Sequence, residues 1–279
     1  MTGNRALANI NGVTPNEAQA DTNMEQGEHV ILEGNPASAV LIVCDHASCF
    51  IPAEFGDLGV VAEHLRDHIA WDIGAGPLAR ALAKELGVTA LLAGVSRLVV
   101  DCNRHLDDPT AFPETSDGVS VPGNSGLTTS DRQHRADTYY WPYHHAIRDR
   151  LCKLESIFAA PAVISIHSFT PELEGVMRPW HIGALWDKDN RISAPFMKYF
   201  GHEKGIMVGD NEPYSGRHKA DFTLDHHAEA EGLPHVGIEI RQDLVTVPGG
   251  VDEWAGILAG ALRVILADST LYTHRAGQQ

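Results

Sequence analysis

Short apolar runs, separated by segments of helical spacing, constrain the fold of this chain more than any other feature. Residues 39–44, 162–166 and 236–240 are almost wholly apolar, as in strands buried on both faces of a sheet. Shorter strand candidates are residues 30–33, 89–93, 98–100, 181–186 and 205–208. Helical spacing covers residues 73–86, 130–159, 190–200, 222–231 and 251–267, with Pro142 expected to kink or split the second of these segments. Alternating strands and helices predict an α/β fold, a single three-layer domain with a mostly parallel or mixed central sheet.

The domain boundaries follow from composition. Residues 1–35 are predicted to be an N-terminal extension, partly flexible, because about the first 30 residues are polar and acidic and carry no apolar leader segment. Residues 36–279 show no internal repeat and no linker, which predicts a single domain. No apolar stretch reaches the roughly 20 residues of a membrane span. The four cysteines have no CxxC or disulfide-framework spacing, so we expect a reduced, cytoplasmic protein.

The net charge bears on the partners. At a formal charge of -16, nonspecific binding to nucleic acid or to an anionic membrane is disfavoured. A small anionic substrate remains compatible, because a local arginine pocket can outweigh a distant negative field. The charge does not determine the oligomeric state.

Polar side chains stand at or just past the ends of several apolar runs. His46, Arg104, His167 and Glu239 hold these positions. In open α/β sheets, ligands bind beyond the carboxyl ends of the strands. We therefore expect these side chains to meet at one edge of the sheet.

The histidines among them are suited to a metal. A catalytic zinc site takes about three protein ligands and keeps one position open. His46 and His167 supply two imidazoles, and Asp72 is the preferred third ligand, although it could instead cap the helix that follows. Asp45 and His68 are alternatives for the third ligand. The cofactor expected is Zn²⁺ or another divalent metal.

The remaining candidates would act on the substrate. Glu239 lies in an apolar strand, where desolvation raises the pKa of a carboxyl and suits it to act as a general base; a salt bridge to Arg241 is the structural alternative. Asn103 with Arg104 suits capture of a carboxylate. Arg97 could hold a second carboxylate or brace Asp101, and Arg178 could bind substrate.

These motifs, taken in order, resemble the N-formylglutamate amidohydrolase family over residues 37–266. The similarity is carried by Asp45-His46-Ala47-Ser48, Asp72-Ile73-Gly74-Ala75, the run from Ser96 to Arg104, His167-Ser168-Phe169, and Ile238-Glu239-Ile240-Arg241. The resemblance implies a fold like that of zinc carboxypeptidases and aspartoacylases. It implies that His46 and His167 bind the metal, that Asn103 and Arg104 grip the substrate carboxylate, and that Glu239 is catalytic. One departure is Cys49, which stands where carboxypeptidases carry a metal-binding glutamate.

The activity implied by this resemblance is hydrolysis of N-formyl-L-glutamate to formate and L-glutamate, a late step of histidine degradation. Two alternatives stay open at this stage. One is a hydrolase for another N-acyl amino acid or a small peptide. The other is a non-catalytic binding protein for an acidic metabolite, which the cysteine at position 49 favours.

Overall fold

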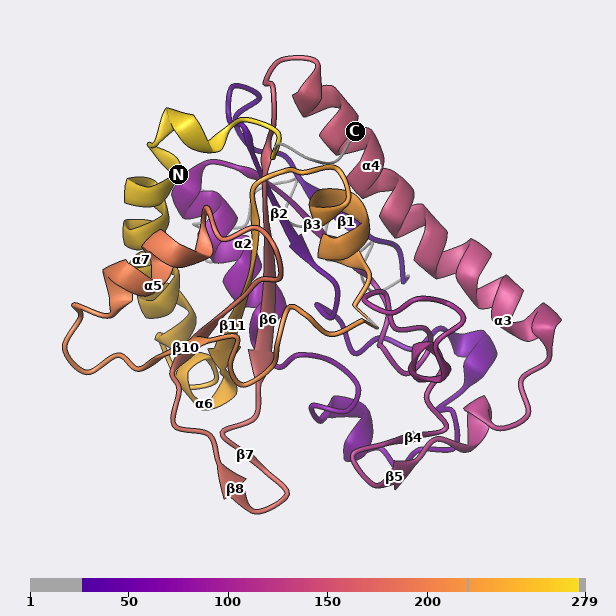
Figure 1. Ribbon diagram of the computed structural model, residues 1–279. Coiled ribbons are helices and arrows are strands. Elements are labelled where there is room, and N and C mark those ends of the chain that lie inside the picture. Colours follow the sequence, from indigo (N-terminus) through magenta and orange to yellow (C-terminus); the bar gives the residue numbers. More distant parts are fainter. Residues whose placement is uncertain (1–26, 220, 276–279) are drawn as a thin grey trace, which may run out of the picture.

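A seven-stranded mixed sheet forms the centre of the computed structural model, which describes residues 27–219 and 221–275 (Figure 1). Its strands are β1 (Val30–Leu32), β2 (Val40–Cys44), β3 (Thr89–Leu92), β6 (Ala162–Phe169), β9 (Ile182–Leu185), β10 (Val208–Asp210) and β11 (His235–Arg241). The order across the sheet is β1-β3-β2-β6-β11-β9-β10. Neighbours run parallel except at β1–β3 and β11–β9. The predicted α/β class with a mixed sheet is confirmed.

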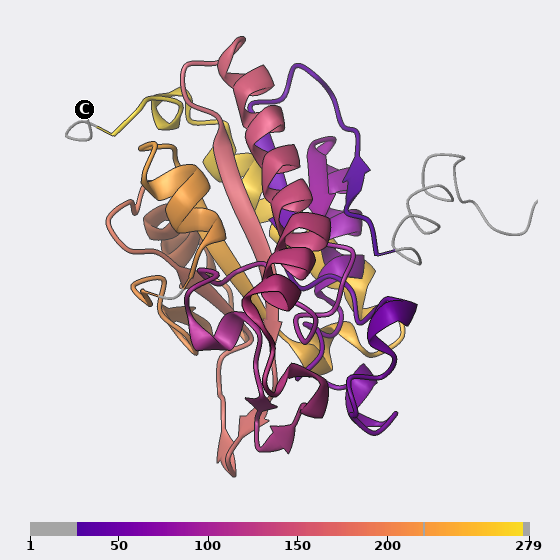
Figure 2. The same ribbon diagram turned by 90° about the vertical axis from the view of Figure 1, so that its right-hand side faces the viewer.

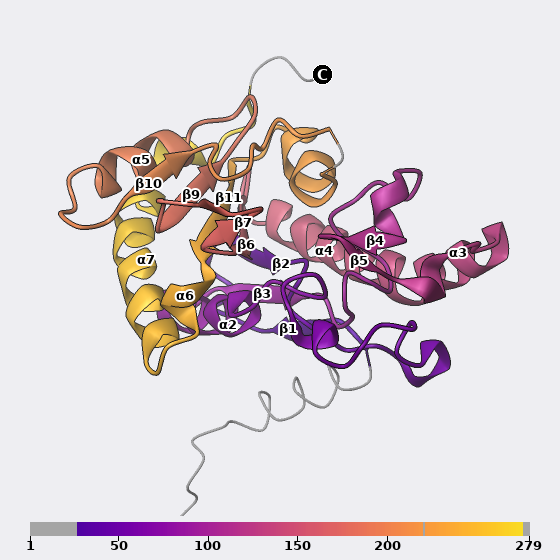
Figure 3. The same cartoon turned by 90° about the horizontal axis from the view of Figure 1, so that it is seen from below.

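Helices cover both faces of this sheet. The helical segments are α2 (Ala75–Leu86), α3 (Thr129–Arg135), η5 (Ala136–Tyr140), α4 (Trp141–Glu155), α5 (Ser193–Phe200), η6 (Asp225–Glu229), α6 (Gln242–Val245) and α7 (Gly250–Leu266). Figure 3 shows α2, α5, α6 and α7 on one side, and α3 and α4 on the other. Figure 2 shows the long helix α4 lying across its face of the sheet. The result is the three-layer arrangement predicted from the sequence.

Smaller elements complete the chain. Two hairpins, β4 (Thr115–Ser116) with β5 (Val119–Ser120) and β7 (Glu172–Leu173) with β8 (Val176–Met177), stand apart from the main sheet (Figure 1). Short 3₁₀ helices are η1 (Ala53–Phe55), η2 (His64–Arg66), η3 (Pro109–Ala111), η4 (Pro122–Asn124) and η7 (Ser269–Leu271). Within the described residues, no helix is both long enough and apolar enough to cross a bilayer.

The two faces of the sheet pack against separate apolar cores. On β2, Val40 and Ile42 belong to the core under α2 and α7, whereas Leu41 and Val43 belong to the core under α4. Successive strand residues point to opposite faces, so a strand between two helical layers must be apolar at every position. This requirement explains the continuous apolar runs in the sequence.

The same alternation determines which face carries the polar side chains of β6 and β11. Ile164 and Ile166 of β6, and Ile238 of β11, face the core under α2 and α7. The intervening residues therefore face the α4 side, among them His167 and Glu239. These two residues are paired directly across the parallel β6–β11 ladder. Strand register alone places an imidazole beside a carboxyl group.

The predicted strand at residues 98–100 is wrong. Residues 97–99 form turns, although Leu98, Val99 and Val100 are buried in the core under α4. The cause is Ser96, whose hydroxyl donates to the Ala70 carbonyl at 2.7 Å and accepts from the Leu98 amide at 3.1 Å. Such local side-chain bonds compete with strand pairing. Apolar character predicted the burial of this segment but not its backbone.

The helical segment after residue 128 is divided as the position of Pro142 predicted. The π-helical turn η5 separates α3 from α4, and Pro142 lies in the first turn of α4, where a missing amide is tolerated. A capping box formed by Thr128 and Asp131 begins α3. The other predicted helices begin and end within a few residues of those observed. The strand expected at 205–208 lies instead at Val208–Asp210.

The predicted strand at residues 30–33 is present in the fold. Residues 1–26 lie outside the described residues, and so does the flexibility predicted for them. The predicted strand is β1, an edge strand that pairs antiparallel with β3 and lies within the residues predicted as an extension. Val30 is buried there in the core under α2 and α7. Residues from β1 onward therefore belong to the domain.

A buried histidine pair lies between α4 and η6. His144 and His227 contact each other at 3.0 Å between Nδ1 and Nε2, and His144 Nε2–H donates to the Cys102 carbonyl at 2.9 Å. Burial lowers the pKa of His144 to about 4. Burial, followed by the neighbouring His144, lowers the pKa of His227 to about 3. Both rings are therefore neutral in the folded protein at neutral pH.

This pair predicts a loss of stability in mild acid. Below the ordinary histidine pKa of 6.5 the unfolded chain binds protons that the folded protein excludes, so stability falls as the pH decreases from about 6.5 toward 4. Each group contributes a slope of at most about 1.4 kcal/mol per pH unit. Urea unfolding at about pH 7 and about pH 5 measures the effect. His227→Gln, which cannot titrate, should have a shallower slope, and an unchanged slope would contradict the assignment.

Candidate active site

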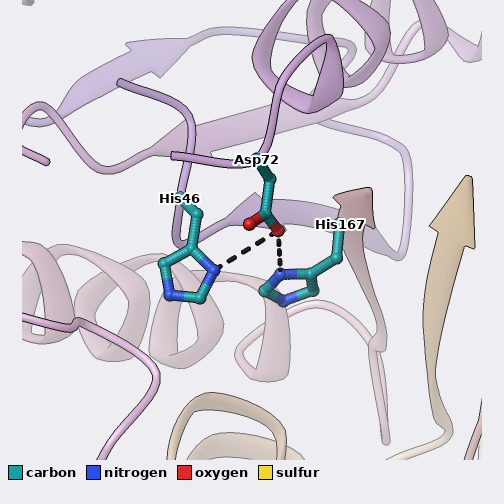
Figure 4. A group of neighbouring side chains, drawn as sticks. All are labelled: His46, Asp72 and His167. Atoms are coloured by element: carbon teal, nitrogen blue, oxygen red, sulfur yellow. Dashed lines mark hydrogen bonds and ion pairs between the residues drawn. The ribbon is translucent and has the colours of Figure 1, made fainter. Parts of the chain in front are cut away.

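Three buried side chains converge at the carboxyl ends of β2 and β6. One ligand atom from each of His46, Asp72 and His167 lies within 4.8 Å of the others. Asp72 Oδ2 is 3.3 Å from Nδ1 of His46 and 2.8 Å from Nδ1 of His167. Figure 4 shows both rings turning a nitrogen toward this carboxylate. The structure thus brings together the three residues that the sequence predicted as metal ligands.

Local structure holds Asp72 against the two histidines. His46 follows β2 in a turn, and its carbonyl accepts the Asp72 amide at 3.0 Å. The N-cap of α2 is Gly74, so capping, the alternative role considered for Asp72, is not what its side chain does. Asp72 Oδ2 also accepts the Ser168 amide at 3.3 Å. The carboxylate is therefore tied to the strand that carries His167.

The nitrogen on the far side of each ring contacts a second carboxylate. His46 Nε2 lies 2.8 Å from Asp101 Oδ1, and His167 Nε2 lies 3.2 Å from Asp45 Oδ2. Metal-binding histidines usually donate their other N–H to such a group, which determines the tautomer and directs the lone pair at the ion. Three convergent ligand atoms, two of them on rings held from behind, fit a divalent metal.

Charge keeps these carboxylates ionised. Burial opposes ionisation of Asp72, but the charge of His46 and the hydrogen bond from His167 outweigh it and hold the pKa of this carboxyl well below its usual range. Burial likewise opposes ionisation of Asp45, yet the hydrogen bond from His167 lowers its pKa to about 2. A metal binds an ionised carboxylate and neutral imidazoles, so a bound ion would take the place of the protons on His46 and His167.

Glu239 differs from Asp45 and Asp72, whose carboxyl groups have hydrogen-bond partners. Its side chain is 5% exposed, and Oε2 is buried with no hydrogen-bond partner among the described residues. Burial raises the pKa of Glu239 to about 8. Arg241, the alternative partner considered, pairs instead with Asp243 at 2.7 Å. Glu239 is therefore a desolvated, unpaired carboxyl group beside His167.

A cavity of about 460 Å³ opens onto these groups. It is lined by the three candidate ligands, by Glu239, and by residues from loops around the sheet edge, including Arg97, Asn103, Arg104, Phe169, Tyr214 and Asp221. The volume lies in the range of small-molecule sites.

Asn103 and Arg104 both border this cavity, and each forms hydrogen bonds with the segment at residues 221–223. Arg104 Nη1 donates to Asp221 Oδ1 at 2.5 Å and to the Asn103 carbonyl at 2.9 Å. The side-chain oxygen of Asn103 accepts the amides of Phe222 and Thr223 at 3.1 and 3.0 Å. Asn103 thus holds a neighbouring loop, and its predicted grip on the substrate carboxylate stays a prediction.

Arg97 has the bracing role, one of the two considered for it. Its Nε and Nη2 donate to Asp101 Oδ2 at 3.0 and 2.7 Å, and Nη1 donates to Asp72 Oδ1 at 3.3 Å. All three guanidinium nitrogens of Arg97 thus donate to carboxylates of the protein, which leaves few N–H groups for a substrate carboxylate. Arg97 therefore supports two acids of the site, and its predicted contact with substrate stays a prediction.

Arg178 lies behind the cavity wall. Its Nη1 donates to Tyr214 Oη at 3.0 Å and to Thr170 Oγ1 at 3.3 Å, and its guanidinium stacks 4.9 Å from the Tyr214 ring centre. It is 7% exposed, yet it has no carboxylate partner among the described residues. A buried cation without a counter-ion next to a cavity is suited to an anionic ligand.

The sequence did not predict the roles of several residues in the candidate site. Asp45 was considered as a ligand, but it supports His167 from behind and accepts from the Tyr143 hydroxyl at 2.9 Å. Asp101 was considered only as a partner of Arg97. Asp101 lies two residues before Asn103, in a motif already assigned to the site, and this position could have identified it. Asp221 lies in no such motif, so the sequence offered no indication of its role. Cys49 is not part of the ligand group, and His68 instead lies between Asp67 and Asp117.

The chain matches a known protein family. The family model for N-formylglutamate amidohydrolase matches residues 38–246, about three quarters of the chain. The protein belongs to the N-formylglutamate amidohydrolase family, as the sequence motifs predicted, and it is thereby an amide hydrolase by class. No curated protein matches the chain.

Two solved structures with TM-scores above 0.5 share the fold, and a third, more distant match is an aspartoacylase family protein. The gene product Atu2144 from Agrobacterium tumefaciens is 34% identical, with 87% of this chain and 96% of that chain covered and a TM-score of 0.83. An N-formylglutamate amidohydrolase from Ralstonia eutropha JMP134 is 24% identical, with 88% and 98% covered and a TM-score of 0.64. An aspartoacylase family protein from Mesorhizobium loti is 15% identical, with 83% and 60% covered and a TM-score of 0.38.

Proposed function

We propose that this protein is a metal-dependent amidohydrolase that cleaves N-formyl-L-glutamate, or a similar N-acyl amino acid, to a carboxylic acid and the free amino acid. One observation carries the proposal. A group of three candidate ligands lies beside Glu239, a buried acid whose Oε2 has no partner among the described residues. A metal ion that activates water and a general base that takes its proton are together one established means of hydrolysing an amide.

His46, Asp72 and His167 would hold the ion. A bound divalent ion such as Zn²⁺ would polarise the amide carbonyl and make water a better nucleophile at neutral pH. Asp101 and Asp45 would keep the two imidazoles oriented from behind.

Glu239 would move the proton. Its carboxylate accepts a proton from the attacking water, and the carboxylic acid then gives that proton to the amide nitrogen as the C–N bond breaks. A raised pKa suits both steps, because the group can gain and lose a proton near neutrality. The products are formate, in the formyl case, and an amino acid.

Two arginines would recognise the substrate. Arg104 borders the cavity and would bind one carboxylate, and the Tyr214 hydroxyl, backed by the charge of Arg178, would bind the other. N-formyl-L-glutamate carries two carboxylates, which matches two arginines. Catabolism of histidine in the cytoplasm is the setting in which this reaction is expected.

A turnover screen tests the proposal. Purified protein loaded with Zn²⁺ is incubated with the N-formyl, N-acetyl and N-succinyl derivatives of L-glutamate, and release of free glutamate is measured. We expect fastest release from the N-formyl derivative and loss of release with a chelator. Faster release from another derivative would identify the other hydrolase considered above. No release from any derivative, despite bound metal, would contradict the proposal and favour the binding-protein alternative.

A further inference from the structure

We propose that Asp221 is a positioning residue for substrate binding: it holds one nitrogen of Arg104 so that the rest of the guanidinium faces the substrate carboxylate. This inference rests on the proposed function, because it assumes that Arg104 binds a substrate carboxylate. Asp221 lies in the loop before η6, far from Arg104 in sequence, and both residues border the cavity.

Arg104 is held on one side only. Its Nη1 carries two hydrogens, and the Asp221 carboxylate and the Asn103 carbonyl accept one each, at 2.5 and 2.9 Å. No described residue accepts from Nε or Nη2 of Arg104. These two nitrogens form one edge of the planar fork, and such an edge binds a carboxylate through two parallel hydrogen bonds.

The position of Asp221 is itself fixed from the Arg104 side. The amides of the two residues that follow it, Phe222 and Thr223, both donate to the Asn103 side-chain oxygen. Thr223 is held further through its hydroxyl, which donates to Asp45 Oδ1 at 2.7 Å. Asn103, Arg104 and the 221–223 segment thus form one hydrogen-bonded unit that reaches the acid behind His167.

This unit explains why a carboxylate stands next to an arginine that must bind another carboxylate. A long arginine side chain loses rotamer freedom when it binds a ligand, and a partner that orders it beforehand reduces this loss. Asp221 accepts from Nη1 of Arg104, so Nε and Nη2 stay available for a bidentate contact with a substrate carboxylate. In the opposite model, Asp221 competes with the substrate for Arg104 and must be displaced. Removing its carboxylate would then lower KM, whereas the positioning model predicts that KM rises.

Asp221→Ala tests the proposal. We expect KM for N-formyl-L-glutamate to rise by about tenfold or more, as for loss of a hydrogen bond to a charged group, while kcat changes by less than about threefold. Asp221→Asn keeps an acceptor oxygen and should restore most of the lost affinity. A fall in KM, or no change, would overturn the proposal.

Two controls separate positioning from general damage. Asp187→Asn removes a charge from the same cavity wall without a contact to Arg104, and it should leave KM nearly unchanged. In an Arg104→Ala background, Asp221→Ala should have no further effect on KM, because the guanidinium that it positions is gone. A full additional effect in that background would assign Asp221 a role independent of Arg104 and overturn the proposal.

Product binding separates this proposal from the function itself. Calorimetry measures the affinity for L-glutamate without any turnover. If the protein binds L-glutamate but hydrolyses none of the derivatives, weaker binding by Asp221→Ala would support the positioning role while the proposed function fails. If the unmodified protein hydrolyses N-formyl-L-glutamate but Asp221→Ala binds L-glutamate as tightly as the unmodified protein does, the proposed function would stand and the positioning role would fail. A protein that neither binds L-glutamate nor turns over any derivative would contradict both proposals.

Discussion

Replacing Glu239 with glutamine is expected to lower turnover of the N-acyl substrate by at least about 100-fold, the usual contribution of a general base. Glutamine has nearly the same shape but cannot accept a proton from water or return one to the leaving amine. Glu239 is buried, and its Oε2 has no partner in the described part of the chain, so the substitution leaves no cation unpaired there. The measurement is steady-state release of free amino acid from the best substrate of the screen.

Metal content is the control for this variant. Glu239 is not one of the three convergent ligands, so Glu239→Gln should retain the metal stoichiometry of the unmodified protein. KM should change little, because the arginines that would bind the substrate are untouched. Activity near that of the unmodified protein would show that another group moves the proton. Lost metal would show that Glu239 is a ligand.

Strand periodicity made the fold predictable. On β6 every position is buried, and on β11 every position except the last, Arg241. Both strands are therefore mainly apolar, and Ser165 and His235 are the only polar side chains in them before His167 and Glu239. The position of the short edge strand β10 was less predictable, because pairing with β9 and not its own sequence determines which residues form it. Residues 98–100 are as apolar as a strand, but the Ser96 hydroxyl bonds the local backbone and turns the chain instead. Local hydrogen bonds of this kind cannot be read from hydrophobicity.

The candidate site was predictable where residue type and strand ends coincide. His46, His167 and Glu239 were assigned in this way, and the Asp72 assignment came from the need for a third ligand. The supporting acids were harder, because a carboxylate behind a ring and a ligand in front of it look alike in sequence. Asp45, adjacent to His46 in the chain, lies behind His167. Asp221 lies more than 100 residues from Arg104, its partner, so only the fold reveals the contact.

Removing the carboxylate of Asp72 is expected to abolish stable metal binding and, with it, turnover. Asp72 Oδ2 is the atom toward which Nδ1 of both histidines points, so Asp72→Ala removes one of three ligands (Figure 4). Asp101→Asn leaves all three ligands in place but weakens the support of His46, and it should reduce metal affinity by about 10- to 100-fold. The loss in Asp72→Ala should exceed that loss. Metal analysis after dialysis against graded chelator measures both.

A matched control separates ligand loss from a change in the charge of the cavity. Asp117 also borders the cavity, but its carboxylate contacts His68 at 2.9 Å and lies outside the ligand group. Asp117→Asn should therefore bind metal as the unmodified protein does. Adding Zn²⁺ in excess should restore turnover to Asp101→Asn, since a weakened site can be filled by mass action, but not to Asp72→Ala. Full metal occupancy and turnover in Asp72→Ala would place the metal elsewhere and remove the basis for hydrolysis at this site.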